Sequence, residues 1–177
     1  MPVRLTRAFF ARDVLEVAPD LVGKVLVRTL PDGRILRARI TETEAYRGEE
    51  DTACHASRGK TPRTEVLYRD AGTIYVYLIY GMHCLLNFVT AEAGIPQAVL
   101  IRATEGAPGP GRLTRALEID RTFNRRNAVT DPALWVEDDG CIPVLRTDKR
   151  VGIDYSAPED RDRLWRFIMQ EKTGEKG

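Results

Sequence analysis

The stretch GTIYVYLIYGMHCLLNFVT, residues 72–90, decides the fold of this chain. Its β-branched, aliphatic and aromatic side chains are typical of strands with buried faces. PQAVLIRAT, residues 96–104, follows after a short break and has the same character. We therefore predict strands at residues 72–81, 84–90 and 96–104, joined by short turns, in the centre of a sheet.

The N-terminal side of this stretch predicts a hairpin and one or two short helices. GKVLVRTL, residues 23–30, and RILRARITETEAY, residues 34–46, alternate in strand fashion around Pro31-Asp32-Gly33, whose glycine suits a tight turn. ARDVLEVAPDLVG, residues 11–23, has apolar residues at helical spacing, and we expect Pro19 to start the second helix.

The C-terminal side predicts one more helix and several short strands. Glycine and proline residues at 106–111 break the chain before RLTRALEI, residues 112–119, which has helical spacing. LWVED, CIPVLRT, RVGI and LWRFIM each indicate a short strand. We therefore expect an α+β fold, a single domain over residues 1–177 with a curved, mixed but mainly antiparallel β-sheet flanked by short helices.

The composition excludes several classes of protein. Hydrophobic residues make up 43% and charged residues 30% of the chain, as in ordinary soluble domains. No apolar run approaches the roughly 20 residues that span a bilayer, and the N-terminus MPVRLTRAFF lacks the features of a secretory signal. We therefore expect a cytoplasmic protein, nucleoid-associated if bacterial, without membrane contact. The net charge of +1 leaves a nucleic-acid partner open.

The cysteines and histidines do not indicate a metal site. Three cysteines without CxxC spacing predict reduced thiols rather than disulfides or a zinc ribbon. The doublets Cys54-His55 and His83-Cys84 would each supply one ligand, because adjacent side chains of an extended chain face opposite ways. Two ligands do not make the four-coordinate site that zinc prefers. We expect no metal and no other cofactor; a surface position for His55 and a core or hydrogen-bonding role for His83 stay open.

Two carboxylates and an aromatic ring lie within TETEAY, residues 41–46. Glu42, Glu44 and Tyr46 share a parity, so on a strand they would line one surface. Glu44 is a candidate general base for the water that splits an N-glycosidic bond, and Tyr46 is a candidate stacking platform. The alternative is that both carboxylates lie on a solvated strand face and pair with nearby arginines.

Three tyrosines in GTIYVYLIYG form a second candidate group. Tyr75 and Tyr77 share a face, whereas Tyr80 has the opposite parity and precedes Gly81 at the strand end. Rings in a pocket could hold an extruded base, and an exposed ring at a turn could wedge between base pairs, each stack contributing roughly 1–3 kcal/mol. The alternative for each tyrosine is ordinary packing in the core.

Two basic segments are candidates for phosphate binding. Residues 47–63 predict a long surface loop that carries basic side chains among small polar residues. Residues 109–112 precede a predicted helix start, whose unpaired N–H groups attract anions. The candidate contacts to a nucleic-acid backbone are Arg58, Lys60, Arg63, Gly109, Gly111 and Arg112. The alternative for each segment is a solvated basic face.

Five segments together carry a family resemblance. They are ITETEAYRGEEDTACHASRGKTPRTEVLY, GTIYVYLIYGMHCLLNFVT, AVLIRATE, GPGRLTRALEID and RVGIDYSAPEDRDRLWRF. In order, spacing and identity they resemble the alkyladenine (3-methyladenine) DNA glycosylases from about Ala11 to Phe167, and the combination of ETEAY with YVYLIYGM is highly specific. The resemblance implies a monofunctional hydrolase of base excision repair, which flips alkylated purines out of duplex DNA and cleaves the N-glycosidic bond with water.

The resemblance also implies roles for single residues. Glu44 would activate the water, and Arg102 would help to hold both this water and the neighbouring phosphate. Tyr80 would enter the duplex where the nucleotide has left, and the bulk of Asn87 would disfavour the exocyclic amino group of normal guanine. The implied base pocket comprises Tyr46, Ala53, His55, Tyr77 and Asn87.

The implied partner is double-stranded DNA with damaged purines, namely 3-methyladenine and 7-methylguanine, with hypoxanthine and etheno-adenine as further candidates. Electron-rich rings would favour methylated purines, which are cationic and have weakened glycosidic bonds. We expect a monomer, because the site needs one chain. The chain departs from the family pattern at Gly106-Ala107-Pro108, a shorter connection than in most members, and at Cys54, where a smaller residue is common.

Two other functions stay open on the sequence. A module that binds distorted DNA without cutting it would use Tyr80 and the basic loop, but it has no need of a carboxylate such as Glu44 near an anionic backbone. Hydrolysis of free nucleosides or glycosides would instead use Glu42 and Glu44 as a carboxylate pair.

Overall fold

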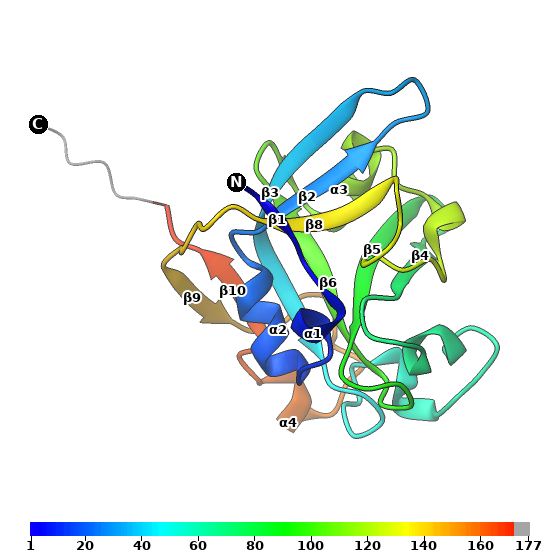
Figure 1. Cartoon of the computed structure of the whole chain (residues 1–177). Helices are drawn as coiled ribbons and strands as arrows, with labels where there is room; N and C mark the ends of the chain where they lie inside the picture. The colour runs from blue at the N-terminus through cyan, green and yellow to red at the C-terminus, as the bar shows by residue number, and fades with distance from the viewer. Residues whose placement is uncertain (172–177) are drawn as a thin grey trace, which may run out of the picture.

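The computed structural model describes residues 1–171, which form a curved sheet with several short helices (Figure 1). The strands are β1 (Val3–Arg4), β2 (Val25–Thr29), β3 (Ile35–Tyr46), β4 (Ile74–Ile79), β5 (His83–Thr90), β6 (Gln97–Thr104), β7 (Ala107–Pro108), β8 (Leu134–Asp138), β9 (Leu145–Asp148) and β10 (Arg166–Met169). The helices are α1 (Arg7–Phe10), α2 (Val14–Leu21), α3 (Pro110–Ala116) and α4 (Pro158–Arg161), with 3₁₀ turns η1 (His55–Arg58), η2 (Glu65–Tyr68) and η3 (Arg121–Phe123). Within residues 1–171, no helix is long and apolar enough to cross a membrane.

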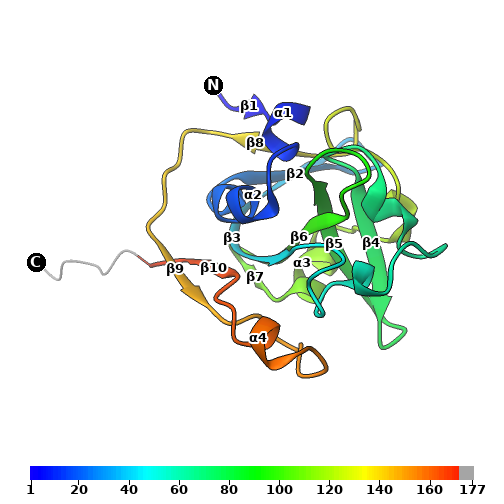
Figure 2. The same cartoon turned by 90° about the horizontal axis from the view of Figure 1, so that it is seen from below.

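The sheet is built around β3, its longest strand. The strand order is β1-β8-β2-β3-β6-β5-β4, and β10 joins β3 beyond the end of β2. The chain from β8 to β9 runs around the edge of the molecule and brings β10 and α4 to this half of β3 (Figure 2). Every strand pair in the described part of the chain is antiparallel. The expected α+β fold with a mainly antiparallel sheet is therefore confirmed, without the parallel pairing that a mixed sheet would contain.

The two faces of the sheet have different environments, because neighbouring residues of a strand point to opposite sides. One face packs against α2, which crosses in front of the sheet in Figure 1, and forms the main core. The buried core side chains from β3 to β6 are Ile40, Ala45, Ile74, Val76, Leu86, Phe88, Val99 and Ile101. The Thr43 hydroxyl also donates to the carbonyl of Ala18 in α2 at 2.7 Å. The opposite face is free to form a site.

The predicted hairpin and the three predicted central strands are present, but the prediction for Pro19 is wrong. Asp13 caps α2 through a hydrogen bond from the amide of Leu15 at 2.9 Å, so the helix begins at Val14. Pro19 therefore falls inside α2 instead of starting a second helix.

Two predictions for the loops are also wrong. RVGI, residues 150–153, forms no strand, because the Val151 amide donates to the side chain of Glu44 and not to a neighbouring strand. Residues 47–63 are more than a surface loop, since several of their side chains are buried and Asp51 pairs with Arg150. Both segments are drawn inward by contacts between residues about a hundred positions apart.

Candidate active site

A row of paired residues crosses four strands on the free face of the sheet. Glu44 on β3 lies opposite Leu100 on β6, Leu100 lies opposite Asn87 on β5, and Asn87 lies opposite Tyr75 on β4. Residues two positions away along these strands point to the same face. They are Tyr46, Tyr77, Leu85, Ala98 and Arg102. Strand parity therefore gathers most of the candidate site residues on one face.

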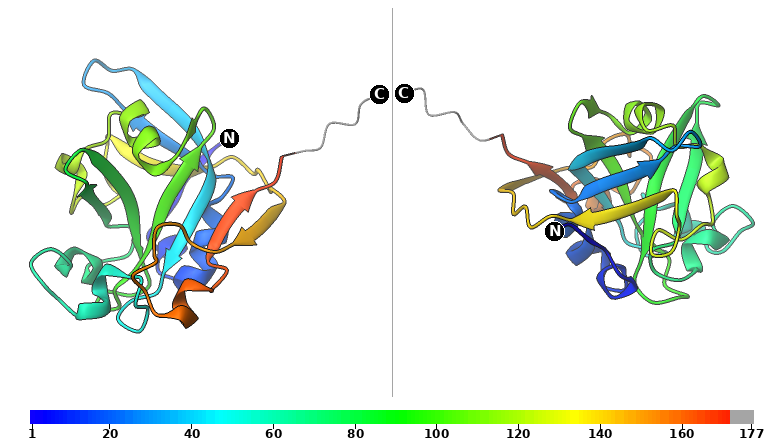
Figure 3. Two further views of the ribbon diagram at one scale, coloured as in Figure 1. Left: turned by 180° about the vertical axis from the view of Figure 1, so that it is seen from behind. Right: turned by 45° about the horizontal axis from the view of Figure 1, so that its top comes forward.

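All of these side chains line a single cavity of about 610 Å³. Its other walls come from residues 53–55 at the start of η1, residues 109–112 at the start of α3, and residues between 151 and 155. The last of these segments, orange in the left view of Figure 3, crosses in front of the end of β3. The volume suits a ligand of the size of a nucleotide.

Glu44 is the buried acidic group of the cavity wall. Its side chain is fully buried; Oε1 accepts a hydrogen bond from the Tyr46 hydroxyl at 3.1 Å and Oε2 accepts one from the Val151 amide at 2.7 Å. Burial raises the pKa of Glu44 above its ordinary value, although the charge of Arg102 and the hydrogen bond from the Val151 amide act to lower it. A carboxylate with a raised pKa is a stronger base, so Glu44 is suited to take a proton from water.

Arg102 lies between the two carboxylates of β3. Its Nε is 3.4 Å from Oε1 of Glu42, and its Nη1 is 3.5 Å from Oε1 of Glu44. Glu42 also pairs with Arg166 at 2.8 Å and lies outside the cavity wall. Of the three residues predicted to line one surface, Glu44 and Tyr46 line the cavity, whereas Glu42 shares Arg102 with Glu44 and lies beyond the cavity wall, at a register shift between β3 and β6.

Tyr46, His55, Tyr75 and Tyr77 place aromatic rings close together in the cavity wall. The ring centroids of His55 and Tyr77 are 4.6 Å apart, and those of Tyr75 and Tyr77 are 5.1 Å apart. The Nδ1 atom of His55 lies 2.9 Å from the Tyr75 hydroxyl, which holds the imidazole in place. Tyr46 projects into the same cavity from β3. This arrangement offers flat surfaces on which a base can stack.

The electrostatics of these rings differ from the expected electron-rich cage. Burial, followed by the charge of Arg63, lowers the pKa of His55 to about 4, so this histidine is neutral at neutral pH and is not a surface histidine. The Arg63 guanidinium lies 5.5 Å from the Tyr77 centroid, and that of Arg150 lies 4.9 Å from the Tyr46 centroid. Two rings already interact with cations. Stacking, more than cation–π attraction, is therefore what the cavity offers a base.

Asn87 and Cys54 are fixed parts of the wall. The Asn87 side chain is buried, and its Nδ2 donates to the carbonyls of Tyr75 at 3.2 Å and Leu85 at 3.4 Å. Burial raises the pKa of the Cys54 thiol to about 11, so the thiol keeps its proton.

The cysteines are free, and among residues 1–171 no three His, Cys, Asp or Glu side chains are grouped to hold a metal.

Tyr80 occupies the tip of the hairpin between β4 and β5, at the rim of the cavity. Its side chain is 87% exposed, and its backbone has a φ of 52°, followed by Gly81 with a φ of 67°. A positive φ is unfavourable for a tyrosine. The hairpin therefore holds an aromatic ring on a strained turn, and the ring is exposed, as the opposite parity of Tyr80 predicts.

His83, at the start of β5, is exposed and not in the core; its ring packs against Gly111.

The candidate contacts to a nucleic-acid backbone divide into two groups. Those that line the cavity are Arg63, Gly109, Gly111 and Arg112. Arg58 and Lys60 lie outside its wall; Arg58 is exposed at the end of η1, and the Lys60 ammonium lies 5.5 Å from the Tyr68 ring centroid.

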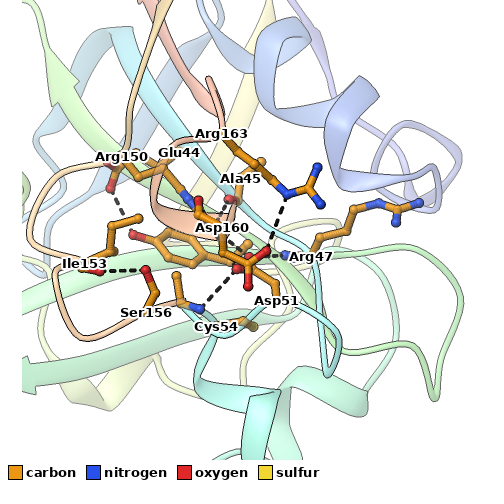
Figure 4. A network of polar contacts seen from close by, with 12 residues as sticks. Glu44, Ala45, Arg47, Asp51, Cys54, Arg150, Ile153, Ser156, Asp160 and Arg163 are labelled. Atoms are coloured by element: carbon orange, nitrogen blue, oxygen red, sulfur yellow. Dashed lines mark hydrogen bonds and ion pairs between the residues drawn. The ribbon is translucent and has the colours of Figure 1, made fainter. Parts of the chain in front are cut away.

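Sequence reasoning missed the residues that join the C-terminal segment to the site, part of which Figure 4 shows. They are Asp51, Arg150, Val151 and Tyr155. Asp51 and Arg150 form a fully buried ion pair, and the Tyr155 hydroxyl donates to the Ala53 carbonyl at 2.7 Å. No local pattern marks these residues, because their partners are about a hundred positions away.

Comparison with known proteins identifies the family. A model of the methylpurine-DNA glycosylases matches residues 8–107 and 104–173. This chain belongs to the methylpurine-DNA glycosylase family. The match to this family divides at residues 104–107, where the sequence predicts the shortened connection.

Relatives within the methylpurine-DNA glycosylase family match over nearly the full length. A protein of Psychrobacter cryohalolentis is 45% identical over 193 residues, covering 93% of this chain and 91% of the relative. One of Methanocella arvoryzae is 46% identical over 187 residues, covering 94% and 92%, and one of Desulfitobacterium hafniense is 43% identical over 196 residues, covering 95% and 96%. Each carries 3-methyladenine DNA glycosylase as a provisional name.

Proposed function

We propose that this chain is a monofunctional DNA glycosylase that excises alkylated purines, foremost 3-methyladenine and 7-methylguanine, from duplex DNA. The observation that carries the proposal is Glu44, a fully buried carboxylate in the wall of an aromatic cavity, next to Arg102. Membership of the methylpurine-DNA glycosylase family and the provisional names of the relatives support it.

In the proposed reaction the damaged base leaves the duplex and stacks between Tyr46 and the rings of His55 and Tyr77. Glu44 takes a proton from a water molecule while the water oxygen forms a bond to C1′ of the sugar. The C1′–N bond breaks, and its electron pair leaves with the purine. Because a methylated purine starts with a positive charge, it leaves as a neutral base without needing a general acid. The carboxylate also balances the positive charge that develops on the sugar.

Tyr80 would fill the gap that the extruded nucleotide leaves in the duplex. Its exposure at the rim of the cavity and its strained turn support this role. A stacked ring contributes roughly 1–3 kcal/mol, which offsets much of the few kcal/mol needed to extrude a base. The neighbouring phosphates would be held by the basic candidates of residues 58–63 and 109–112.

The proposed substrate range and oligomeric state both follow from this cavity. Because Arg63 and Arg150 lie against two of the rings, the pocket does not depend on a cationic base, and hypoxanthine and etheno-adenine are further candidate substrates. The bulk of buried Asn87 would disfavour the amino group of normal guanine. All lining residues belong to one chain, so we propose that the protein acts as a monomer built as a single domain.

The carboxylate-pair alternative has little support, because Glu42 lies outside the cavity wall and binds two arginines. The test is an assay of base release from methylated duplex DNA, from the same DNA as single strands, and from methylated nucleosides. The proposal predicts release from duplex DNA and little from nucleosides. Equal release from nucleosides would favour the glycoside alternative, and tight duplex binding without release would favour a binding module.

A further inference from the structure

Asp51 and Arg150 form an ion pair behind the cavity that neither the reaction nor the base binding described above uses. Both side chains are fully buried. The Nη1 atom of Arg150 lies 2.6 Å from Oδ2 of Asp51, and its Nη2 lies 3.0 Å from Oδ1, so the contact is bidentate. Burial lowers the pKa of Arg150, but the hydrogen bonds that its guanidinium donates to Asp51 and the negative charge of Asp51 outweigh this effect and raise the pKa. Arg150 is therefore a permanent buried cation.

The same guanidinium reaches the strand that carries the catalytic candidates. Nη1 also donates to the carbonyl of Ala45 at 3.0 Å, and Ala45 stands between Glu44 and Tyr46 on β3 (Figure 4). The guanidinium carbon lies 4.9 Å from the Tyr46 ring centroid and does not line the cavity, so it backs the ring from within the protein. Arg150 thus contacts both the backbone and the aromatic platform at the end of β3.

Asp51 links Arg150 to the loop that forms the opposite wall of the cavity. Its Oδ1 accepts the amide of Ala53 at 3.1 Å, and its Oδ2 accepts the amide of Arg47 at 3.0 Å. These two bonds shape the chain that leads into η1 and His55. The residue after Arg150 is Val151, whose amide binds Glu44. One ion pair therefore joins β3, the 47–54 loop and the C-terminal segment, which meet at the cavity.

A buried ion pair contributes little net stability to a folded protein. Removing two charges from water costs as much as their attraction returns, and well-packed apolar residues often replace such a pair without loss of stability. What apolar residues cannot do is bind two backbone amides, the carbonyls of Ala45 and Asp160, and the Tyr46 ring at fixed angles. The value of this pair therefore lies in geometry.

We propose that Arg150 is a positioning residue: held by Asp51, it aligns the end of β3, with Glu44 and Tyr46, against the Ala53–His55 wall of the base cavity. The inference rests on the proposed function of this site.

The positive charge of Arg150 also acts on Glu44. The groups that face this carboxylate are Arg102 on β6, Tyr46 on β3, Tyr77 on β4, and Tyr155 and Arg150 in the C-terminal segment. Arg102 and Arg150 are the cations among them, and both lower the pKa of Glu44. Loss of the Arg150 charge therefore leaves Glu44 harder to ionise.

The test compares this ion pair with a second one, in which the carboxylate is buried and the arginine is partly exposed. D51N/R150Q replaces the pair by two neutral amides, so no buried charge is left alone. R126Q/D131N does the same to a pair outside the cavity wall, in which buried Asp131 binds Arg126 and also accepts the amides of Ala133 and Leu134. Arg150→Lys keeps the charge but cannot span all the partners. Each protein is assayed for folding by its unfolding midpoint and for single-turnover excision of 3-methyladenine from duplex DNA across pH.

The proposal predicts that D51N/R150Q loses about 100-fold in the excision rate at saturating enzyme, as expected when reacting groups are misplaced by about 1 Å. The acid limb of its pH profile should move to higher pH. Arg150→Lys should restore the position of the acid limb with only part of the rate, and R126Q/D131N should lose stability but less than about 3-fold in rate. Excision by D51N/R150Q at the wild-type rate, or equal losses in the two double variants, would overturn the inference alone. No excision by the wild-type protein would overturn the proposed function, and this inference with it.

Discussion

The Oε2 atom of Glu44 accepts a hydrogen bond of 2.7 Å from the backbone amide of Val151, a residue 107 positions further along the chain. Its Oε1 atom faces the Tyr46 hydroxyl and Arg102. Both oxygens are therefore oriented before any substrate enters, on a side chain that is fully buried. A base that is fixed in advance does not have to reorganise during the reaction, which is the main electrostatic advantage of an enzyme site.

Glu44→Gln is expected to stabilise the folded protein at neutral pH. Burial raises the pKa of Glu44 above its ordinary value of 4.5, so the folded state binds this proton more tightly than the unfolded chain does. The ionised carboxylate therefore costs stability at neutral pH, and the cost vanishes below pH 4.5, where both states are protonated. Denaturant titrations of wild type and variant should show a gain near neutral pH and none in acid.

Glu42→Gln serves as the matched control for this stability measurement. Glu42 pairs with Arg102 and Arg166 and is partly exposed, so its loss should lower the free energy of unfolding at neutral pH or leave it unchanged. A loss of stability in Glu44→Gln equal to that in Glu42→Gln would show that Glu44 is an ordinary ion-pair partner.

His55 should stay neutral at every pH at which the enzyme works. Its pKa is lowered to about 4 by burial and by Arg63, so a proton is taken up first by the unfolded chain as the pH falls below 6.5. The stability that neutral His55 contributes is therefore present above pH 6.5 and is lost as the pH falls toward 4. The chain has two histidines, so ¹⁵N NMR spectra of wild type and His55→Gln can assign the titrations. A His55 signal that titrates near 6.5 would contradict this environment.

Tyr80→Gly is expected to separate DNA engagement from stability. The change removes the exposed ring and also relieves a φ of 52°, so excision should fall by about 10-fold or more, the equivalent of one lost stack, while the unfolding midpoint stays or rises. Glu118→Gly is the control, because Glu118 is exposed with the same φ of 52° and lies outside the cavity wall. Equal excision by the two variants would remove Tyr80 from the mechanism.

The basic residues near η1 should reveal themselves by salt dependence. If Arg58, Lys60 and Arg63 each neutralise a phosphate, every change to glutamine should lower the slope of log affinity against log salt by about 0.9. Arg34→Gln is the control, since Arg34 lies at the tip of the β2–β3 hairpin, far from η1 in Figure 1. Slopes unchanged in all three variants would assign these side chains to a solvated face.

Much of the site was predictable because it depends on strand parity. Alternation along the predicted strands assigns Glu44 and Tyr46 to one face, and Tyr75 and Tyr77 to another common face, and the antiparallel register then joins these faces into a single cavity. The exposed position of Tyr80 follows from parity and from the glycine after it. Family membership is confirmed by the match to the methylpurine-DNA glycosylases.

The errors arise where long-range contacts override local pattern. Glu42 shares Arg102 with Glu44 but lies beyond the cavity wall, at a register shift of which a single sequence carries no sign. The 47–63 loop is drawn inward by Asp51, whose partner Arg150 lies 99 positions away. RVGI has strand-like composition, but its amide at Val151 is committed to a carboxylate. Such contacts become visible only when the chain is folded.

The most direct test of the account is the release of free base from methylated duplex DNA by the wild-type protein and by Glu44→Gln under single-turnover conditions. The wild-type protein should release 3-methyladenine, and Glu44→Gln should bind the same DNA but release the base roughly 10²–10⁴-fold more slowly. Release by Glu44→Gln at the wild-type rate, or no release by the wild-type protein at any enzyme excess, would contradict the account.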